Sequence, residues 1–163
     1  MIPKEIRRTM RIREGDPLEI FTDKDGELIF KKYSPIGELT DFAAQICDSL
    51  RRVTDGVAAV CDRDAVIAVS GGGKKELLDR PISPQLAEIM EGRAAYRSSG
   101  GGTIPVSPAD EHFCLSVAAP ILTEGDVMGC VLFLAPPGSQ AATEVEYKLA
   151  QTAALFLGKQ MEQ

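Results

Sequence analysis

Two long apolar runs in the second half of the chain constrain the fold most. Residues 113–122 and 127–135 are apolar at nearly every position, and only Thr123-Glu124-Gly125-Asp126 separates them. Two such runs joined by a four-residue connection that contains Gly are typical of an antiparallel β-hairpin. The length and hydrophobicity of both runs predict that this hairpin forms the centre of a sheet.

The elements around this hairpin follow from periodicity and from capping residues. Residues 36–53 are apolar at helical spacing, and residues 57–61 and 65–69 are short β-branched runs that flank a turn at 62–64. Ser83 and Thr143 are suitable N-caps for a helix over 84–92 and for a final helix. The apolar side of the final helix is predicted to comprise Val145, Leu149, Thr152, Ala153, Phe156, Leu157 and Met161.

This order of elements predicts an α+β fold. From residue 36 the chain reads helix, two strands, helix, a Gly-, Ser- and Pro-rich loop over 98–111, two strands and helix. A central antiparallel sheet with the first and last helices packed on one face satisfies that order. The opposite face of such a sheet is expected to be free for a ligand cavity.

The N-terminal segment differs from the rest of the chain in charge. Residues 1–13 hold Lys4, Arg7, Arg8, Arg11 and Arg13 against Glu5 alone, whereas residues 34–163 hold ten basic and seventeen acidic side chains. Affinity for phosphates comes from local clusters of Lys and Arg, and not from the net charge of −6 of the whole chain. If the protein binds DNA, we expect residues 1–13 to contact it.

The same segment predicts a small structural unit of its own. Residues 4–10 read as a short helix after Pro3, and residues 18–22 and 27–33 as two strands joined by a turn that contains Gly26. Its apolar surface is too small for independent stability, so it requires a partner chain or more sequence. We therefore divide the chain into a segment 1–35 and a larger domain 36–163, connected by the helix 36–53.

Composition excludes several classes of protein. The apolar content of 44% supports a real core, and no apolar run approaches the ~20 residues of a membrane span. The charged N-terminus does not resemble an export signal, so we expect a cytoplasmic protein. The four cysteines are widely spaced and His112 is the single histidine, which predicts buried, reduced thiols and neither a metal site nor a cofactor. The four cysteines are Cys47, Cys61, Cys114 and Cys130.

Three stretches of the N-terminal segment resemble the DNA-binding domain of AbrB-like transition-state regulators. They are IPKEIRRT at 2–9, IREGDPLEI at 12–20 and KKYSP at 31–35. Downstream, the chain is similar to the GAF-type sensor domain of a sporulation regulator in that family. The downstream similarity includes DFA at 41–43, CDRD at 61–64, IAVSG at 67–71, Lys74-Lys75 and the final helix. The resemblance therefore implies an incomplete swapped-hairpin β segment followed by a GAF-like domain.

One departure from the family pattern concerns the beginning of the chain. The family's DNA-binding domain begins with a further strand and basic loop ahead of the position of Ile2, and two chains interleave their hairpins. Either the true start lies upstream of Met1, or this form has an impaired DNA-binding half. We favour a start upstream, because the basic helix and the hairpin are otherwise intact.

The resemblance implies a DNA-binding transcription regulator of sporulation genes, activator or repressor, associated with the nucleoid. Its partners would be double-stranded DNA, a second copy in a homodimer or homotetramer, and an unidentified small ligand; no membrane partner is expected. Arg7 and Arg8 are the expected DNA contacts, and Lys4 and Arg11 are weaker candidates for phosphate contacts. The alternative is a stand-alone GAF-like sensing or oligomerisation module that does not bind DNA.

Ligand-binding residues in the larger domain can be assigned only from strand ends. Ser70, Gly71 and Lys74 follow a predicted strand, and Ser116 lies in another. The run SGGGKK at 70–75 does not have the spacing of a phosphate loop, so a flexible connection is favoured, with anion binding by backbone N–H groups as the alternative. An enzyme is not expected, because His112 has no evident acidic or nucleophilic partner and the cysteines form no close set.

Overall fold

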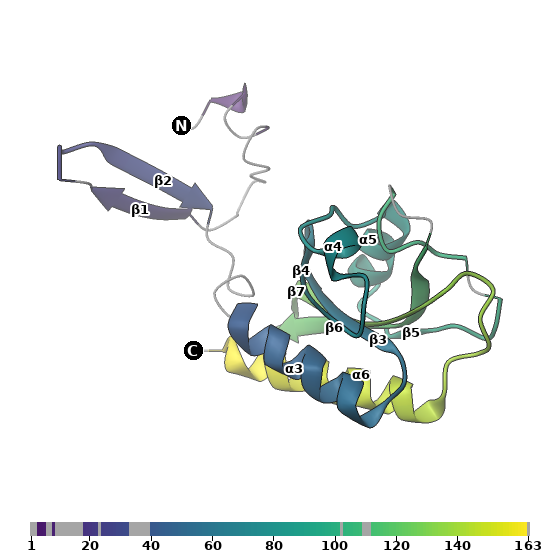
Figure 1. The fold of residues 1–163 in the computed structure, drawn as a ribbon. Coiled ribbons are helices and arrows are strands. Elements are labelled where there is room, and N and C mark those ends of the chain that lie inside the picture. Colours follow the sequence, from purple (N-terminus) through teal and green to yellow (C-terminus); the bar gives the residue numbers. More distant parts are fainter. Residues whose placement is uncertain are drawn as a thin grey trace.

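The computed structural model describes residues 3–5, 8, 18–22, 24–32, 40–101, 103–108 and 112–162. Two strands come first, and the remaining elements form an α+β domain (Figure 1). In chain order the elements are β1 (Leu18–Thr22), β2 (Leu28–Lys32), α3 (Thr40–Val53), β3 (Val57–Asp62), β4 (Val66–Ser70), α4 (Lys74–Leu77), α5 (Pro84–Glu91), β5 (Tyr96–Arg97), β6 (Cys114–Thr123), β7 (Asp126–Ala135) and α6 (Glu144–Gln160).

The sequence predicts most of these elements and misses two short ones. The strands, the helix at 84–91 and the final helix lie within a residue or two of their expected bounds, and residues 36–39 of the first expected helix lie outside the described part. The helix α4 and the two-residue strand β5 were not expected. None of the helices in the described part has the length and hydrophobicity needed to cross a bilayer.

The sheet of the larger domain has five strands in the order β4-β3-β7-β6-β5, and every neighbouring pair is antiparallel. The β6–β7 hairpin occupies the centre, as its hydrophobicity predicts. Along β3, alternate residues point to opposite faces of the sheet, with Val60 on one face and Cys61 on the other. The sheet therefore has two apolar faces, and each needs a cover.

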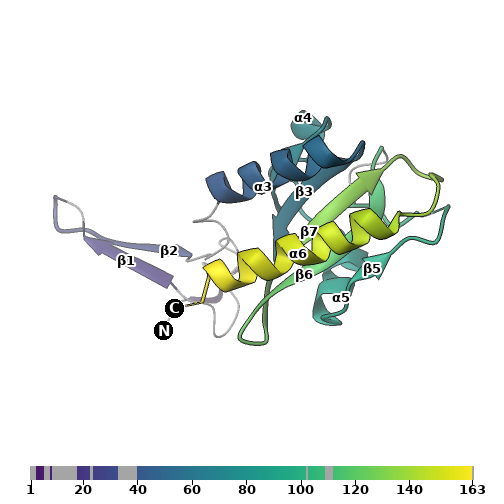
Figure 2. The same cartoon turned by 90° about the horizontal axis from the view of Figure 1, so that it is seen from below.

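The helices α3 and α6 cover one face and lie side by side across it (Figure 2). Phe133 of β7 is the largest fully buried side chain, and the phenyl rings of Phe42 and Phe156 stack between the two helices with centroids 5.4 Å apart. Small residues on α6 allow the helix to approach the strands. The buried cluster comprises Ala43, Cys47, Leu50, Ala58, Val60, Ala68, Val117, Ala119, Ile121, Val131, Phe133, Ala142, Ala150, Ala153, Ala154 and Leu157.

The opposite face is covered as well, which corrects the expectation that it is free for a cavity. The helices α4 and α5 lie over it, together with part of the loop between β5 and β6 (Figure 1). Leu77, Leu86 and Val106 are fully buried there. The expectation failed because α4 and the covering loop lack the periodicity that reveals a packed element. The buried cluster comprises Ala59, Cys61, Val66, Val69, Leu77, Leu86, Met90, Val106, Leu115, Ala118, Val127, Cys130, Leu132 and Leu134.

Ser83 fixes the position of α5 over this face. Its Oγ accepts from the N–H of Leu86 at 3.1 Å, which is the expected N-cap, and donates to the carbonyl of Pro105 at 2.7 Å. The N–H of Ser83 donates to the carbonyl of Val106 at 2.8 Å. One buried serine therefore joins the start of the helix to the covering loop.

The final helix begins as predicted and presents part of the predicted apolar side to the sheet, with Ala153 and Leu157 buried. Thr143 and Glu146 form a capping box, with the Thr143 Oγ1 accepting from the N–H of Glu146. Val145, Thr152 and Phe156 of the predicted apolar side are exposed. The buried residues are Ala150, Ala153, Ala154, Leu157 and Gly158, because small residues are needed where the helix lies close to β6.

The C-terminal end of α6 contacts the turn of the β6–β7 hairpin directly. A Cβ at position 158 would overlap the carbonyl of Leu122, so Gly158 is required for the close approach. The Oγ1 of Thr123 donates to the carbonyl of Gly158 at 3.0 Å. The backbone of the helix and that of the hairpin are thereby joined.

Candidate functional site

The N-terminal hairpin has the expected strands and an apolar surface exposed to solvent. β1 and β2 pair with Leu18 opposite Lys32 and Thr22 opposite Leu28, and Gly26 adopts the positive φ of 82° that a tight turn favours. Ile20 and Leu28 are 62% and 60% exposed. Such a pair of short strands is not stable in water by itself, so these side chains require a cover.

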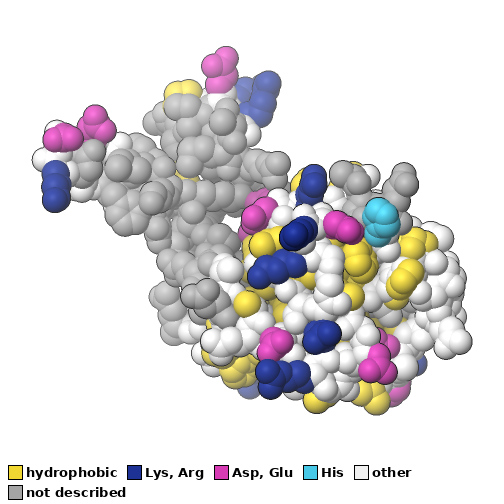
Figure 3. Space-filling view, in the orientation of Figure 1, with side chains coloured by type: hydrophobic (Ala, Val, Ile, Leu, Met, Phe, Trp, Pro, Cys, Tyr) yellow, Lys and Arg dark blue, Asp and Glu magenta, His cyan; other side chains and the backbone are white. Residues whose placement is uncertain are grey.

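Two of the four expected DNA contacts lie in the described part of the chain. Lys4 and Arg8 are both helical and both exposed, so their charged groups are accessible to a phosphate. Arg7 and Arg11 lie outside the described residues. On the face of the larger domain that Figure 3 shows, basic and acidic side chains are interspersed. That mixed surface contrasts with the local positive charge of residues 1–13.

The turn after β4 holds three of the residues that were assigned to a ligand. Ser70 ends the strand opposite Ala58, and Gly71 has a φ of 107° where a Cβ would lie 3.1 Å from the carbonyl oxygen of Gly56. Gly73 has a φ of 71°, and a Cβ there would lie 2.7 Å from the ring of Phe113. Lys74 begins the four-residue helix α4 and is exposed. Turn geometry and close packing thus account for the glycines.

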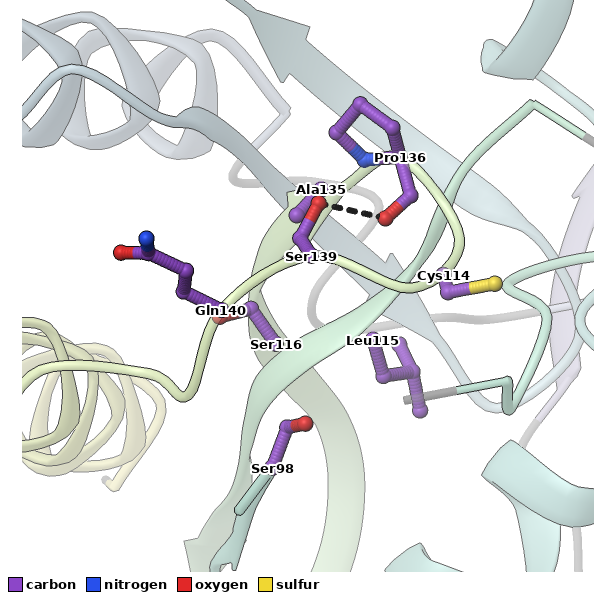
Figure 4. A pocket seen from close by; sticks show the side chains of 8 residues that line it. All are labelled: Ser98, Cys114, Leu115, Ser116, Ala135, Pro136, Ser139 and Gln140. Atoms are coloured by element: carbon purple, nitrogen blue, oxygen red, sulfur yellow. Dashed lines mark hydrogen bonds between the residues drawn. The ribbon is translucent and has the colours of Figure 1, made fainter. Parts of the chain in front are cut away.

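Ser116 lies elsewhere, at a β-bulge in β6. The register shifts between Leu115 and Val117, so Ser116 is the additional residue of the bulge, a feature that re-aims a side chain. It lines a small recess at the end of β6 and β7, together with residues of the loops at 98 and 135–140 (Figure 4). Its carbonyl accepts from the N–H of Ser98 at 2.8 Å. The other lining residues are Ser98, Cys114, Leu115, Ala135, Pro136, Ser139 and Gln140.

The structure therefore does not bring the four assigned ligand residues together. Ser70 is on β4 and Ser116 on β6, with β3 and β7 between them, a separation on the order of 14 Å at the usual strand spacing. Sequence reasoning missed Ser98 and Ser139 of the recess, because both come from loops whose positions depend on tertiary contacts. The volume of the recess, about 10 Å³, is space for about one water molecule.

The cysteines are free and buried, as composition predicts. Burial raises the pKa of Cys47 to about 12. Burial also raises the pKa of Cys130 well above its ordinary value, and the adjacent Cys61 adds to that rise. Cys61 and Cys130 are register partners on β3 and β7, a pairing that the sequence did not reveal. Thiols with raised pKa values in an apolar core are poor nucleophiles, which is consistent with a structural role.

His112 has an acidic neighbour, which corrects the expectation that it has none. Its Nδ1 lies 3.8 Å from Oε2 of Glu76, and both side chains are largely exposed. The fold brings α4 beside the start of β6, a contact between residues far apart in the sequence. An exposed pair of this kind contributes little to stability. Among the described residues, His, Cys, Asp and Glu form no group that could hold a metal ion.

Comparison with known proteins identifies both parts of the chain. Residues 38–162 match the family described as stage V sporulation protein T C-terminal, transcription factor. The chain belongs to the stage V sporulation protein T family. Residues 1–38 match the family described as antidote-toxin recognition MazE, bacterial antitoxin. Stage V sporulation protein T of Bacillus subtilis (strain 168) is 48% identical over 164 residues, which covers 100% of this chain and 91% of that protein.

Solved structures that resemble this stage V sporulation protein T family member include several GAF domains. That of the GAF domain/HD domain protein from Geobacter sulfurreducens has a TM-score of 0.56 at 16% identity, over 77% of this chain and 95% of that chain. The cofactor-binding GAF domain of the nutrient sensor CodY from Clostridium difficile has a TM-score of 0.56 at 11% identity, over 99% of both chains. At these identities the likeness establishes the GAF fold alone.

Proposed function

We propose that the chain is a DNA-binding transcription regulator of sporulation genes, in which a GAF-like sensor domain modulates an oligomeric AbrB-like DNA-binding segment. The observation that carries this proposal is the 48% identity to stage V sporulation protein T over the whole chain. The family description names a transcription factor, which favours a regulatory role over catalysis. The match at residues 1–38 favours a DNA-binding regulator over a stand-alone sensing module.

The two functions divide between the two parts of the chain. We assign DNA binding to residues 1–35 and sensing to residues 36–163, with the helix that includes α3 as the connection. The division is supported by the two family matches, which meet at residue 38. A regulator of this kind acts in the cytoplasm, associated with the nucleoid.

DNA binding is assigned to the basic residues of the first segment. Lys4 and Arg8 are exposed on helical residues and carry the positive charge that phosphates require. Arg7 and Arg11 belong to the same local excess of charge, four positive units over residues 1–13. The larger domain is acidic overall, so electrostatics favours contact with the duplex through the N-terminal segment.

Self-association is supported by apolar side chains that one copy leaves exposed. On the hairpin these are Ile20 and Leu28, and a second hairpin would cover them. On α6 they are Val145 and Phe156, which are 59% and 40% exposed. Large apolar side chains that one copy leaves exposed at two places support contacts with a second copy. A homodimer or homotetramer built on these surfaces is the proposed functional form.

We assign the sensor ligand to two candidate places in the larger domain. Ser116 faces a recess that admits about one water molecule, so an effector would bind there only after the loops at 98 and 135–140 move apart. Ser70, Gly71 and Lys74 form a separate turn at the far side of the sheet, where backbone N–H groups and a lysine would suit an anion. Substituting Ser116 in one variant and Lys74 in another would show which of the two places binds the effector.

Binding to promoter DNA tests the proposal. Fluorescence anisotropy with a labelled duplex from upstream of a sporulation gene should show affinity that falls steeply with salt. The double substitution Arg7→Ala with Arg8→Ala should abolish binding, and Lys4→Ala should reduce the salt slope by about 1. The matched control is Arg80→Ala, an exposed arginine of the sensor domain.

Two outcomes would contradict the assignment. If the double variant binds as tightly as the parent at equal salt, Arg7 and Arg8 are not DNA contacts. If the parent is oligomeric yet binds no duplex at low salt, the chain acts as a sensing or oligomerisation module instead. Size-exclusion chromatography with light scattering supplies the second measurement.

A further inference from the structure

A groove lies between α6 and the edge of the sheet, apart from the Ser116 recess and from the face that α4 and α5 cover. In Figure 2, α6 has α3 on one side and the β6–β7 hairpin on the other, and the groove belongs to the hairpin side. Its volume is about 220 Å³. The walls are mainly apolar and are provided by Pro120 and Leu122 of β6 and by Ala154 and Leu155 of α6.

The short length of β5 leaves this edge of the sheet open. β5 pairs only with Val117 and Ala118, so among the described strands nothing pairs with β6 on that side from Ala119 onward. Pro120 lacks an N–H group and therefore suits an unpaired edge. The edge is closed to an additional β-strand at that position, but its apolar side chains remain accessible.

Arg93 places a positive charge at this apolar groove. Its Nε–H donates to the carbonyl of Gly125 at 3.0 Å, and its Nη1 donates to the carbonyl of Glu91 at 3.1 Å. Both acceptors are neutral, and Arg93 forms no ion pair within the described part of the chain. The guanidinium is thus oriented by backbone carbonyls while other N–H groups stay available. A planar cation of this kind suits a carboxylate.

The size of the groove limits the ligand. The groove volume of about 220 Å³ is far larger than the 10 Å³ of the Ser116 recess, so the groove admits a small organic molecule. A phosphate would leave the apolar walls without contact. A short hydrocarbon tail would cover Leu122 and Leu155, both of which are exposed in the chain alone.

We propose that this groove binds a small carboxylate with a short hydrocarbon tail. The carboxylate contacts Arg93, and the tail lies between β6 and α6. The site goes beyond the proposed function, because it lies on the α6 side of the sheet and none of the assigned ligand residues lines it. Binding would act on α6, whose exposed residues carry the proposed self-association surface.

Titration with hexanoate tests the site directly. In ¹H–¹⁵N NMR spectra of the full chain, hexanoate should shift amides near residues 93, 119–122 and 151–155, with a Kd on the order of millimolar for a ligand of this size. Hexanamide has the same tail without the charge and should bind at least tenfold more weakly. Arg93→Gln should also weaken hexanoate at least tenfold, whereas Arg80→Gln should not change the affinity.

Three results would overturn the proposal. The first is equal affinity for hexanoate and hexanamide, a comparison that needs no variant and holds even if Arg93→Gln unfolds. The second is a set of shifts confined to the α4 and α5 face. The third is that the groove amides shift when the protein is diluted but not when hexanoate is added, which would mean that a second copy fills the groove. None of these results depends on DNA binding, so they leave the proposed function to its own test.

Discussion

The chain contains two kinds of antiparallel hairpin that share a local design and differ in their surroundings. β1–β2 and β6–β7 both have a glycine with positive φ in the turn. The strands of the first are five residues long and expose Ile20 and Leu28, whereas those of the second are ten residues long and almost wholly buried. Pairing is thus a local property, and stability depends on what covers the faces.

The two hairpins differ in role because they differ in what covers their apolar side chains. Helices on both sides bury β6–β7, which places this hairpin at the centre of the larger domain. Ile20 and Leu28 of β1–β2 have no comparable cover among the described residues, and in the proposed function a second copy provides it. A hairpin that depends on another chain can respond to oligomerisation, whereas a hairpin at the centre of a core cannot.

The largest effect is expected for Phe133→Ala in β7. The side chain is fully buried between the sheet and the helices, and its removal leaves a cavity. The free energy of unfolding should fall by about 3–5 kcal/mol, measured by urea denaturation. Leu28→Ala in the first hairpin is the matched control and should leave this transition nearly unchanged. A loss below about 1.5 kcal/mol for Phe133→Ala would show that β7 is not the centre of the core.

Ser83→Ala tests how firmly the second face of the β6–β7 hairpin is covered. The substitution removes the N-cap of α5 and the hydrogen bond to Pro105, so unfolding free energy should fall by about 1–2 kcal/mol. Ser99→Ala, at an exposed serine, is the control. Equal stability of the two variants in thermal and urea denaturation would mean that the cover does not depend on this cap.

A smaller effect concerns pH and the face covered by α3. Burial raises the pKa of Cys47 from 9.0 to about 12, so the folded state retains the thiol proton more strongly than the unfolded state does. The protonated Cys47 thiol contributes fully to the free energy of unfolding below pH 9, and this contribution is lost as pH rises from 9 toward 12. At pH 10 the loss is about 1 kcal/mol. Cys47→Ala should remove this part of the alkaline destabilisation. Identical pH profiles for the variant and the parent between pH 8 and 10.5 would contradict the burial of Cys47.

The smallest effect on unfolding is expected for Ile20→Ser combined with Leu28→Ser. Because these side chains are exposed in one copy, the unfolding free energy of the larger domain should change by less than about 0.5 kcal/mol. The oligomer should nevertheless dissociate at a higher protein concentration than the parent, as light scattering would show. Thr22→Ala on the same hairpin is the control. An unchanged oligomer would mean that the hairpin surface is not a subunit contact.

The sequence predicts those parts of the fold whose signals are local. The helix α3 has apolar residues at regular spacing, and the capping residues Ser83 and Thr143 mark the starts of α5 and α6. β5 could not be predicted, because two residues have no periodicity and their strand exists only through pairing with β6. The buried side of α6 was predicted in part: Ala153 and Leu157 are buried as expected, whereas Phe156 is 40% exposed and small residues such as Ala150 complete the contact.

The candidate sites depend even more on tertiary contacts. The expected basic residues follow from composition and resemblance, and their roles stay predictions. The recess at Ser116 and the groove at Arg93 both combine a strand with loops or a helix from distant parts of the chain. No local pattern indicates that Arg93 would be held by the carbonyl of Gly125, 32 residues further along the chain.

The contact between Gly158 and Leu122 limits how α6 can move. Sliding the helix by one turn along its axis, about 5.4 Å, would bring Ala154 opposite the Leu122 carbonyl, and its Cβ would collide with it. The hydrogen bond from Thr123 to Gly158 would also break. Tilting about this point preserves both contacts. Gly158 therefore allows α6 to change its angle to the sheet more readily than its position along its own axis.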